Sequence, residues 1–508
     1  MRERITYLQK LGSSLPPSAL TITPTSLTGP SVSAIREERL TFALDELPAE
    51  LSSILKNDVH ELHVRWVNPV AYESVGAMVA RVPGGWHLFW TPVLGKESQK
   101  EGGRGARLCE VLGGVFGVAC GGEESFTKLP SERFYHSAAL QYFQPLEGLG
   151  RFVEYAKGKL CAEEDGDCVR RVDALAEASA LDVSYDSISH ALKVTALWAF
   201  QEQEIRATAR PNVRTEVGVL SDEKTATMED HELGVSGLLT VLGQDEKPSA
   251  TVFSFPSRHR DAGSGFEAEF VQVGLHPVLQ LKLGSNKPPV EEAACATHAY
   301  FTFPRTIFAD RYQLSDDLFL ASKNLTALRY ISQPVDLEAP EYVMKTWGSA
   351  ALLELKPPAM DDGKAEESWT AEVPLHLRYL TPSHGGYANL EVPYPAVFWA
   401  CNAEEGTKFP TNPFERVNLG YDGLFGPRTV FWHVEPRPVS GGRVTSSIRV
   451  PVLDLDKAGW VNVGTAAVVL LGFAWISWKL LSVYLKTGYG SESRGSRTSE
   501  TRDDKKRQ

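Results

Sequence analysis

The clearest apolar segment of the chain runs from Trp460 to Trp478 and reads WVNVGTAAVVLLGFAWISW. It contains no charged residue and is bracketed by Lys457 and Lys479. About 20 residues of this kind, rising about 1.5 Å each, cross a hydrocarbon core of about 30 Å. Tryptophan at both ends is typical of the aromatic belts at membrane surfaces. The pattern therefore predicts a transmembrane helix over residues 459–479.

Basic residues gather on the C-terminal side of this segment. Because lysine and arginine favour the cytosolic side of a span, we expect residues 480–508 in the cytosol and the bulk of the chain in a lumen. Few apolar residues follow Gly488, so the tail is predicted to be disordered. Lys505 and Lys506 resemble the dilysine signal that returns membrane proteins to the endoplasmic reticulum. The basic residues are Lys479, Lys486, Arg494, Arg497, Arg502, Lys505, Lys506 and Arg507.

Within residues 1–200, the spacing of apolar residues is typical of strands in some segments and of helices in others. Strand-like segments lie near Ile5 and over 40–47 and 61–67, and helical residues are expected between the last two. The spacing over 169–181 is helical, whereas apolar side chains alternate with polar ones from Leu192 to Trp198. This mixture predicts an N-terminal α+β region. The following stretch, 201–234, is polar, and we expect it to be a linker between two domains.

From 235 to 455 the chain consists of short β segments separated by proline and glycine turns. Many short strands at close spacing favour a β-sandwich, with a jelly-roll or a Greek-key path. The predicted fold class is therefore mainly β: a luminal β-sandwich-like domain, preceded by the α+β region and followed by one transmembrane helix. The strand-like segments include 250–255, 266–273, 278–283, 298–303 and 373–379.

Charge and cysteine content narrow the class of protein. The formal net charge of -12 argues against a nucleic-acid binder, which needs a basic face to neutralise phosphates. The six cysteines form no CxxC pair and have no zinc-ligand spacing. Their even number suits disulfides in an oxidising lumen, and it suits buried thiols of a cytosolic protein equally well. They are Cys109, Cys120, Cys161, Cys168, Cys295 and Cys401.

Two further segments of the predicted luminal region bear on its compartment. Residues Met1–Lys10 have no apolar run, so they do not read as an ordinary cleavable signal peptide. The absence of such a peptide leaves open how a luminal body would be translocated. Asn324-Leu325-Thr326 is a glycosylation sequon, and we expect Asn324 to carry a glycan if the body is luminal.

A segment from Val373 to Cys401 reads VPLHLRYLTPSHGGYANLEVPYPAVFWAC. It resembles the core signature of the PIG-X family, a PLHLRY strand followed by a turn and a proline-rich strand that ends on a cysteine. Upstream, 275–277, Cys295 and 304–314 are also similar, and the N-terminal half resembles the extension of the family's fungal, protease-B-nonderepressible branch. The matching signature residues are Pro374, His376, Arg378, Tyr379, Pro393, Pro395, Phe398 and Cys401.

This resemblance implies a non-catalytic role. PIG-X-like proteins bind and stabilise a polytopic, PIG-M-like mannosyltransferase, which moves the first mannose from dolichol-phosphate-mannose to the GPI precursor in the lumen of the endoplasmic reticulum. No cofactor is implied. A general luminal chaperone for membrane or secretory clients is the alternative. The resemblance also suggests a disulfide between Cys295 and Cys401, with Cys109–Cys120 and Cys161–Cys168 as further candidates, although six cysteines do not fix their own connectivity.

Two interpretations of the signature residues stay open. On a strand, His376 and Arg378 share a face while Leu375 and Leu377 point to the core. With Tyr379 they form either a polar strip that contacts the partner, or a structural pair in which Arg378 holds a carbonyl or a carboxylate. Pro393 and Pro395 predict an edge or a bulge near Phe398, which either accepts a partner strand or protects the edge.

The sequence contains only short or incomplete matches to the motifs of enzymes. Asp165-Gly166-Asp167 and Asp454-Leu455-Asp456 match the DxD pattern of metal-holding sugar transferases, but three-residue matches are common among 64 acidic residues. His384-Gly385-Gly386 faintly resembles a lipase oxyanion loop and lacks a GxSxG partner. Because transferases that use dolichol-linked sugars are polytopic, a chain with one predicted span is better suited to be a scaffold.

Overall fold

The computed structural model describes residues 1–93, 103–130, 139–162, 164–224, 228, 232–272, 274–291, 293–332, 335–359, 367–410, 412–414, 416–439 and 441–488. The chain divides into two compact units. Unit 1 holds 1–380 and 389–450, and unit 2 holds 381–388 and everything from Pro451 onward. The predictions of a mainly β chain and of one apolar helix near the C-terminus are confirmed.

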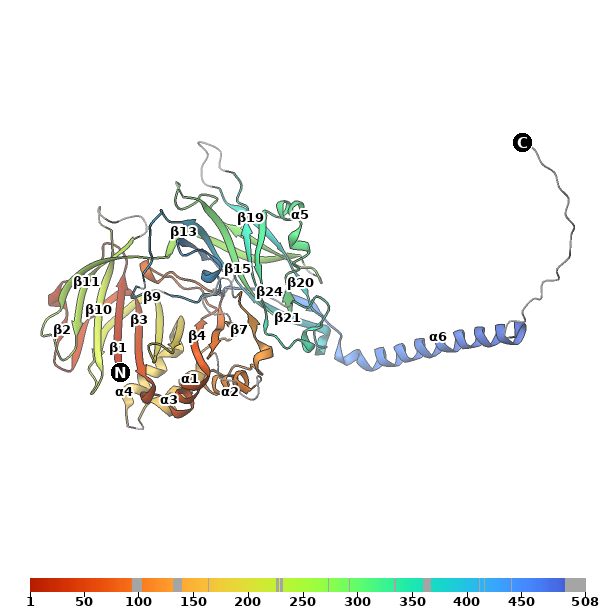
Figure 1. Ribbon diagram of the computed structural model, residues 1–508, viewed down its shortest axis with the longest axis horizontal. Coiled ribbons are helices and arrows are strands. Elements are labelled where there is room, and N and C mark those ends of the chain that lie inside the picture. Colours follow the sequence, from red (N-terminus) through yellow and green to blue (C-terminus); the bar gives the residue numbers. More distant parts are fainter. Residues whose placement is uncertain are drawn as a thin grey trace, which may run out of the picture. The chain divides into compact units, whose positions relative to one another are not determined.

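The first sheet of unit 1 has 12 strands in the order β12-β11-β10-β1-β3-β9-β8-β4-β5-β7-β6, with β2 paired to β3. Four helices accompany it (Figure 1). Its strands are β1 Arg2–Gln9, β2 Thr21–Ile22, β3 Ser26–Ala43, β4 Val59–Val67, β5 Gly85–Pro92, β6 Thr127–Lys128, β7 Leu140–Gln144, β8 Ala180–Asp186, β9 Ala191–Thr208, β10 Arg214–Glu223, β11 Glu232–Val241 and β12 Ser249–Pro256. The helices are α1 Ala49–Asp58, α2 Gly103–Phe116, α3 Gly150–Leu160 and α4 Gly166–Asp173.

The second sheet has 8 strands in the order β17-β18-β15-β22-β23-β13-β14-β19, and two 2-stranded sheets, β16-β20 and β21-β24, accompany it. A short helix, α5 (Asp317–Ser322), precedes β17. The strands are β13 His259–Gln272, β14 Val278–Leu283, β15 Cys295–Pro304, β16 Ile307–Phe308, β17 Leu325–Ile331, β18 Gly348–Leu355, β19 Trp369–Pro374, β20 His376–Leu377, β21 Tyr387–Pro393, β22 Ala396–Asn402, β23 Thr429–Pro436 and β24 Thr445–Pro451.

The central strands of the second sheet are buried on both faces. In β22 the side chain of Phe398 packs in a core cluster with α2 and the first sheet, whereas its neighbours Val397 and Trp399 pack in the opposite cluster with β14 and β20. In β15, Tyr300 and Phe301 divide between the same two clusters. Strands buried on both faces read as continuous apolar runs, which explains AYFTF and AVFWA. The largest core therefore joins the N-terminal and C-terminal halves of unit 1.

The predicted linker over 201–234 is wrong. Strand β9 extends to Thr208, β10 follows, and β11 begins at Glu232. On β9, Gln203, Ile205 and Ala207 are buried while the residues between them are exposed. Polar side chains thus cover the solvent face of a strand whose other face packs in the core. The first sheet ends at Pro256, and the residues on both sides of 201–234 belong to the same compact unit.

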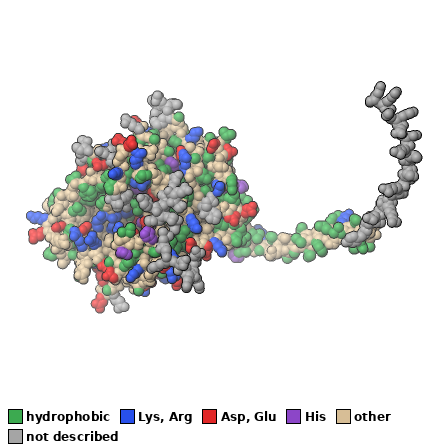
Figure 2. Space-filling model, in the orientation of Figure 1, with side chains coloured by type: hydrophobic (Ala, Val, Ile, Leu, Met, Phe, Trp, Pro, Cys, Tyr) green, Lys and Arg blue, Asp and Glu red, His purple; other side chains and the backbone are tan. Residues whose placement is uncertain are grey.

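Unit 2 contains the long helix α6, Ala458–Thr487. The segment Leu455–Thr487 is long and apolar enough to cross a membrane, and none of its apolar window is buried by the described residues. Figure 2 shows hydrophobic side chains along the surface of this helix. Its 30 helical residues span about 45 Å, longer than a hydrocarbon core of about 30 Å. The predicted disordered tail is thus helical over 480–487, and residues 489–508 lie outside the described part of the chain.

Candidate functional site

Three of the segments that carry the family resemblance lie side by side in unit 1. Strand β20 pairs with β16, so that His376 lies opposite Phe308 and Leu377 opposite Ile307. On its other side, Leu377 N donates to the carbonyl of Leu275 at 2.9 Å. The PLHLRY segment is therefore the middle strand of a small platform built from 275–277, 304–314 and 374–379.

His376 is the centre of this platform. Its Nε2 lies 3.0 Å from Gln313 Oε1, and its Nδ1 lies 2.9 Å from Nδ1 of His276. A neutral His376 that donates from Nε2 to Gln313 and accepts at Nδ1 from His276 satisfies both contacts. Its ring stacks on Phe308 with centroids 5.4 Å apart. Burial, aided by the nearby His276, lowers the pKa of His376 and favours this neutral form.

Arg378 has a structural role. The residue is 5% exposed, its Nη1 donates to the carbonyl of Ala339 at 2.8 Å, and its guanidinium lies 4.4 Å from the Phe308 ring centre. Burial lowers its pKa, against the opposing field of Asp336. Because His376 and Arg378 both contact Phe308, they share a face as the alternation predicts. Of the two interpretations, the bond from Arg378 to a backbone carbonyl is the one that the structure contains.

Exposed apolar side chains surround the platform. Tyr379 is 68% exposed, and its carbonyl accepts a hydrogen bond from Glu341 N at 2.9 Å, which attaches the next exposed segment to it. Exposed aromatic side chains clustered on a rigid support are typical of binding surfaces. We call this set the signature surface, and it comprises Leu275, Tyr312, Tyr342, Val343 and Tyr379.

The second half of the predicted partner surface lies elsewhere. Phe398 is 0% exposed and lies on β22, between β15 and β23 in the middle of the second sheet. Pro393 ends β21, and both it and Pro395 are buried. These three residues are therefore buried in the core, and β22 is not an edge, whereas β21, which ends at Pro393, has β24 as its one partner among the described strands. The signal for this was the uninterrupted apolar run around Phe398, which is typical of a central strand.

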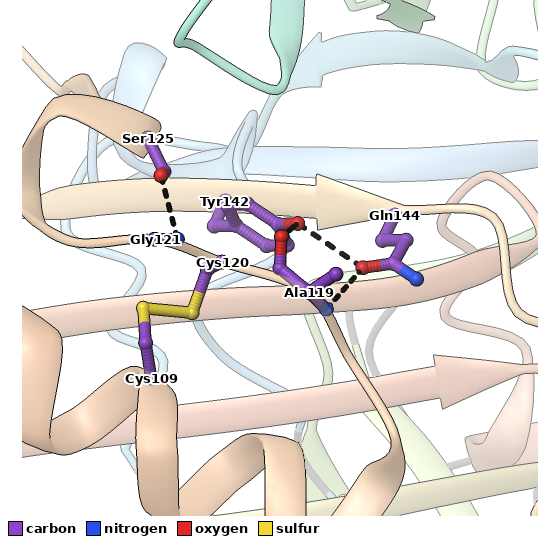
Figure 3. Close-up of a disulfide and its surroundings, with 7 residues drawn as sticks. All are labelled: Cys109, Ala119, Cys120, Gly121, Ser125, Tyr142 and Gln144. Carbon is purple, nitrogen blue, oxygen red and sulfur yellow. Dashed lines mark hydrogen bonds between the residues drawn. A yellow bond between two sulfur atoms is a disulfide. The ribbon is translucent and has the colours of Figure 1, made fainter.

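All six cysteines lie in disulfides, Cys295–Cys401, Cys109–Cys120 and Cys161–Cys168. Cys295 and Cys401 are register partners on the adjacent strands β15 and β22, at the site that the resemblance suggested. Figure 3 shows Cys120 held beside β7, where Gln144 Oε1 accepts from Ala119 N at 2.9 Å. Three bridges fasten the body covalently, as in proteins that fold in oxidising compartments.

The remaining predicted site residues are separate from the signature surface. Asn324 is exposed between α5 and β17 in the left-handed conformation, and its Nδ2 donates to the carbonyl of Thr370 at 2.8 Å. Lys505 and Lys506 lie outside the described residues. The first aspartate of each DxD motif caps a helix, because Asp165 accepts from Cys168 N and Asp454 accepts from Asp456 N. Within the described ranges, no group of three or more His, Cys, Asp or Glu is arranged to hold a metal.

No sequence pattern indicates the contact between His276 and His376. The two residues are 100 positions apart, and only the pairing of 275–277 with the PLHLRY strand brings them together. A second feature had no local signal at all. Glu37, buried on β3, binds Arg416 Nη2 at 2.6 Å and so attaches the 412–418 segment to the first sheet.

Comparisons with known proteins bear on the same region. The family model described as PIG-X / PBN1 matches residues 272–481, which contain the whole signature surface. Protein pbn1 of Neurospora crassa is 60% identical over 97% of each chain, and Protein PBN1 of Gibberella zeae is 45% identical over 96% of this chain and 97% of that one. The C-terminal domain of the Streptococcus agalactiae AgI/II polypeptide BspA is 7% identical over 79% of this chain and 96% of that chain, and its TM-score of 0.15 is too low to support an argument. The relatives and the matched region together show that this chain belongs to the PIG-X/PBN1 family, in its fungal Pbn1 branch.

Proposed function

We propose that this chain is the non-catalytic subunit that stabilises GPI mannosyltransferase I. Membership of the PIG-X/PBN1 family implies a role in GPI-anchor biosynthesis and an association with its machinery. The finer role is that of a scaffold for a polytopic, PIG-M-like catalytic subunit, which transfers the first mannose from dolichol-phosphate-mannose in the lumen of the endoplasmic reticulum.

The signature surface carries this proposal. It comprises three exposed residues of the platform and two of the segment that Glu341 N attaches to Tyr379, and all five lie inside the region matched by the family model. His376 and Arg378 connect the segments of this surface by hydrogen bonds to Gln313 and to the Ala339 carbonyl. A rigid apolar surface suits a protein partner, because apolar burial drives association and a preorganised support lowers its entropic cost.

Further observations support a scaffold over a catalyst. The first aspartate of each DxD motif, Asp165 or Asp454, accepts a backbone N–H group as a helix cap, so its carboxylate already serves the fold. A single apolar helix is the one candidate span among the described residues, whereas an enzyme that works on two lipid-linked substrates needs several helices around a cavity.

The proposed location is the membrane of the endoplasmic reticulum, with the body luminal and the basic tail cytosolic. Three disulfides in the body suit an oxidising lumen. Asn324 is exposed and available for glycosylation there. The charges that follow α6 agree with the positive-inside rule.

The first test is the GPI precursor profile of cells depleted of this chain, with the dolichol-phosphate-mannose supply checked as normal. We expect the unmannosylated glucosaminyl-acyl-inositol lipid to accumulate and the catalytic subunit to become unstable. A normal profile with a normal level of the catalytic subunit would refute the proposal. Broad association with unrelated luminal clients would then favour the general chaperone.

The second test compares an exposed and a buried signature residue. Tyr379→Ala should leave the free energy of unfolding within about 0.5 kcal/mol, because the side chain is exposed, yet reduce the co-purified catalytic subunit several-fold. Arg378→Ala should destabilise the chain itself by about 1–3 kcal/mol, since the buried guanidinium is removed and the partly buried Ala339 carbonyl loses its donor. Ile188→Ala, exposed on the β8–β9 turn, is the matched control. Unchanged co-purification of Tyr379→Ala would exclude Tyr379 from the interface.

A further inference from the structure

Two segments that are distant in sequence form a compact structure at the start of α6. Ser383 N donates to the carbonyl of Leu453 at 3.1 Å, Leu455 N donates to the carbonyl of Ser383 at 3.1 Å, and Val452 N donates to the carbonyl of Gly386 at 3.0 Å. All of these residues belong to unit 2. We call residues 381–388 and 451–457 the collar. Its hydrogen bonds fix the geometry of the chain immediately before the apolar helix.

The charges of the collar are paired within it. Asp454 accepts from Asp456 N at 3.0 Å and lies 3.3 Å from Lys457 Nζ. Asp456 Oδ1 lies 2.9 Å from His384 Nδ1. The backbone N–H of Asp456, with smaller contributions that include Lys457, lowers the pKa of Asp454. Pairing of this kind reduces the cost of placing charges where less water is available.

Apolar side chains of the collar are exposed. Leu453 is 47% exposed, Leu455 is 42% exposed and Tyr387 is 50% exposed. Leu453 and Leu455 lie just before α6, where Trp460 is 82% exposed and no charge occurs between Lys457 and Lys479. Exposed leucine and tyrosine side chains this close to the start of an apolar helix need an environment that accepts both.

The distance from the collar to Trp460 matches the depth of the headgroup layer of a bilayer. Leu455 precedes Trp460 by five residues, or about 8 Å along a helix. The headgroup layer on each side of a hydrocarbon core is about 5–8 Å deep. If Trp460 marks the edge of the hydrocarbon, the collar falls within or directly above the headgroups. Leucine and tyrosine side chains next to paired charges are suited to this layer.

We propose that the collar is a second membrane-contact site, which lies in the headgroup layer of the bilayer with Leu453, Leu455 and Tyr387 against lipid. The inference rests on the part of the proposed function that places α6 across the membrane. By fixing the segment before the helix, the collar sets the depth of α6 and holds the start of the span at a constant distance from the surface. The partner is the phospholipid surface itself, so the contact requires no catalytic subunit.

The test uses the full chain, without partner, in phosphatidylcholine nanodiscs. Because all native cysteines are in disulfides, a single introduced cysteine provides one labelling site for an environment-sensitive fluorophore. Leu453→Cys, Leu455→Cys and Tyr387→Cys report the collar, Leu471→Cys reports the middle of α6, and Ile188→Cys is the exposed control. Nitroxide quenchers are placed either on the lipid headgroup or on the acyl chain. Near-ultraviolet circular dichroism verifies that each labelled variant is folded.

We expect the headgroup quencher to reduce collar emission several-fold more than emission from position 188, and the acyl-chain quencher to act most strongly at position 471. Collar labels quenched no more than position 188, with position 471 still quenched from the acyl chain, would overturn the collar proposal and leave the span intact. Absence of quenching at position 471 would instead refute the membrane span on which the inference rests.

Discussion

At the scale of single residues, two buried histidines form a hydrogen-bonded pair. His259 and His433 are 5% and 2% exposed, and His259 Nδ1 lies 3.0 Å from His433 Nε2. Burial lowers the pKa of His259 to about 3 and holds the pKa of His433 far below its ordinary value. Both imidazoles are therefore neutral in the folded chain, and one donates a hydrogen bond to the other.

This pair predicts a loss of stability in mild acid. An unfolded histidine gains a proton near pH 6.5, whereas these folded ones do not, so the unfolded state binds more protons as the pH falls below 6.5. Stability is complete above that pH, and each such histidine removes about 1.4 kcal/mol per pH unit well below it. His433→Gln should therefore flatten the decline in unfolding temperature between pH 6.5 and 5.

The measurement is the thermal unfolding of the full chain in detergent at a series of pH values. The window above pH 5 separates this effect from Glu37 and Asp182, whose pKa values are lowered and whose protonation destabilises only below their unfolded values near 4. His190→Gln, on the exposed β8–β9 turn, is the control. Equal slopes for the original chain and His433→Gln would show that His433 is not the acid-sensitive group.

At the scale of elements, local pattern and tertiary burial account for different parts of the structure. The alternation in PLHLRY correctly predicts that Leu375 and Leu377 are buried, because a strand places successive side chains on opposite faces. Phe398 was assigned to a surface although its burial follows from the strands on either side, which no local window contains. The end of β9, residues 201–208, is an alternating strand that its polar side chains conceal, because Ile205 and Ala207 are the only apolar residues in that part.

The disulfides allow a prediction at the same scale. Cys295–Cys401 closes a separation of 106 residues between β15 and β22, whereas Cys161–Cys168 closes only 7. A longer loop loses more entropy when it is cross-linked in the unfolded chain. Replacing Cys295 and Cys401 by alanine should therefore lower the free energy of unfolding by about 5 kcal/mol, against about 2 kcal/mol for the short bridge.

Denaturant titrations of the two double variants, without reductant, measure this difference. The short bridge at the start of α4 is the control, because it closes a short loop and lies outside both sheets. If both variants lost the same stability, or if the short bridge mattered more, the constraint on the unfolded chain would not be the main contribution of Cys295–Cys401.

At the scale of the whole molecule, buried charges couple the two halves of unit 1. Glu37 on β3 is 1% exposed and receives Arg416 Nη2 at 2.6 Å, while Arg4 and Arg39 lie within 3.4 Å of the same carboxylate. Arg4 also donates to the carbonyl of Pro413 at 2.8 Å. Burial alone would raise the pKa of Glu37, but the three guanidinium groups hold it below its ordinary value.

Removing the charge of Glu37 should therefore loosen both halves together. Glu37→Gln leaves three guanidinium groups around a neutral amide, and loss of one partner from a buried ion pair costs about 3–5 kcal/mol. Glu38→Gln is the matched control, because Glu38 is the next residue, is 18% exposed and binds Arg171 at 2.7 Å. We expect a much smaller effect there. Hydrogen exchange should accelerate in Glu37→Gln across both β3 and β22, since the largest core is continuous between the two sheets. Faster exchange confined to β1, β3 and β9 would mean that the halves unfold independently, and the 412–418 segment would then be a local attachment without a role in holding the body together.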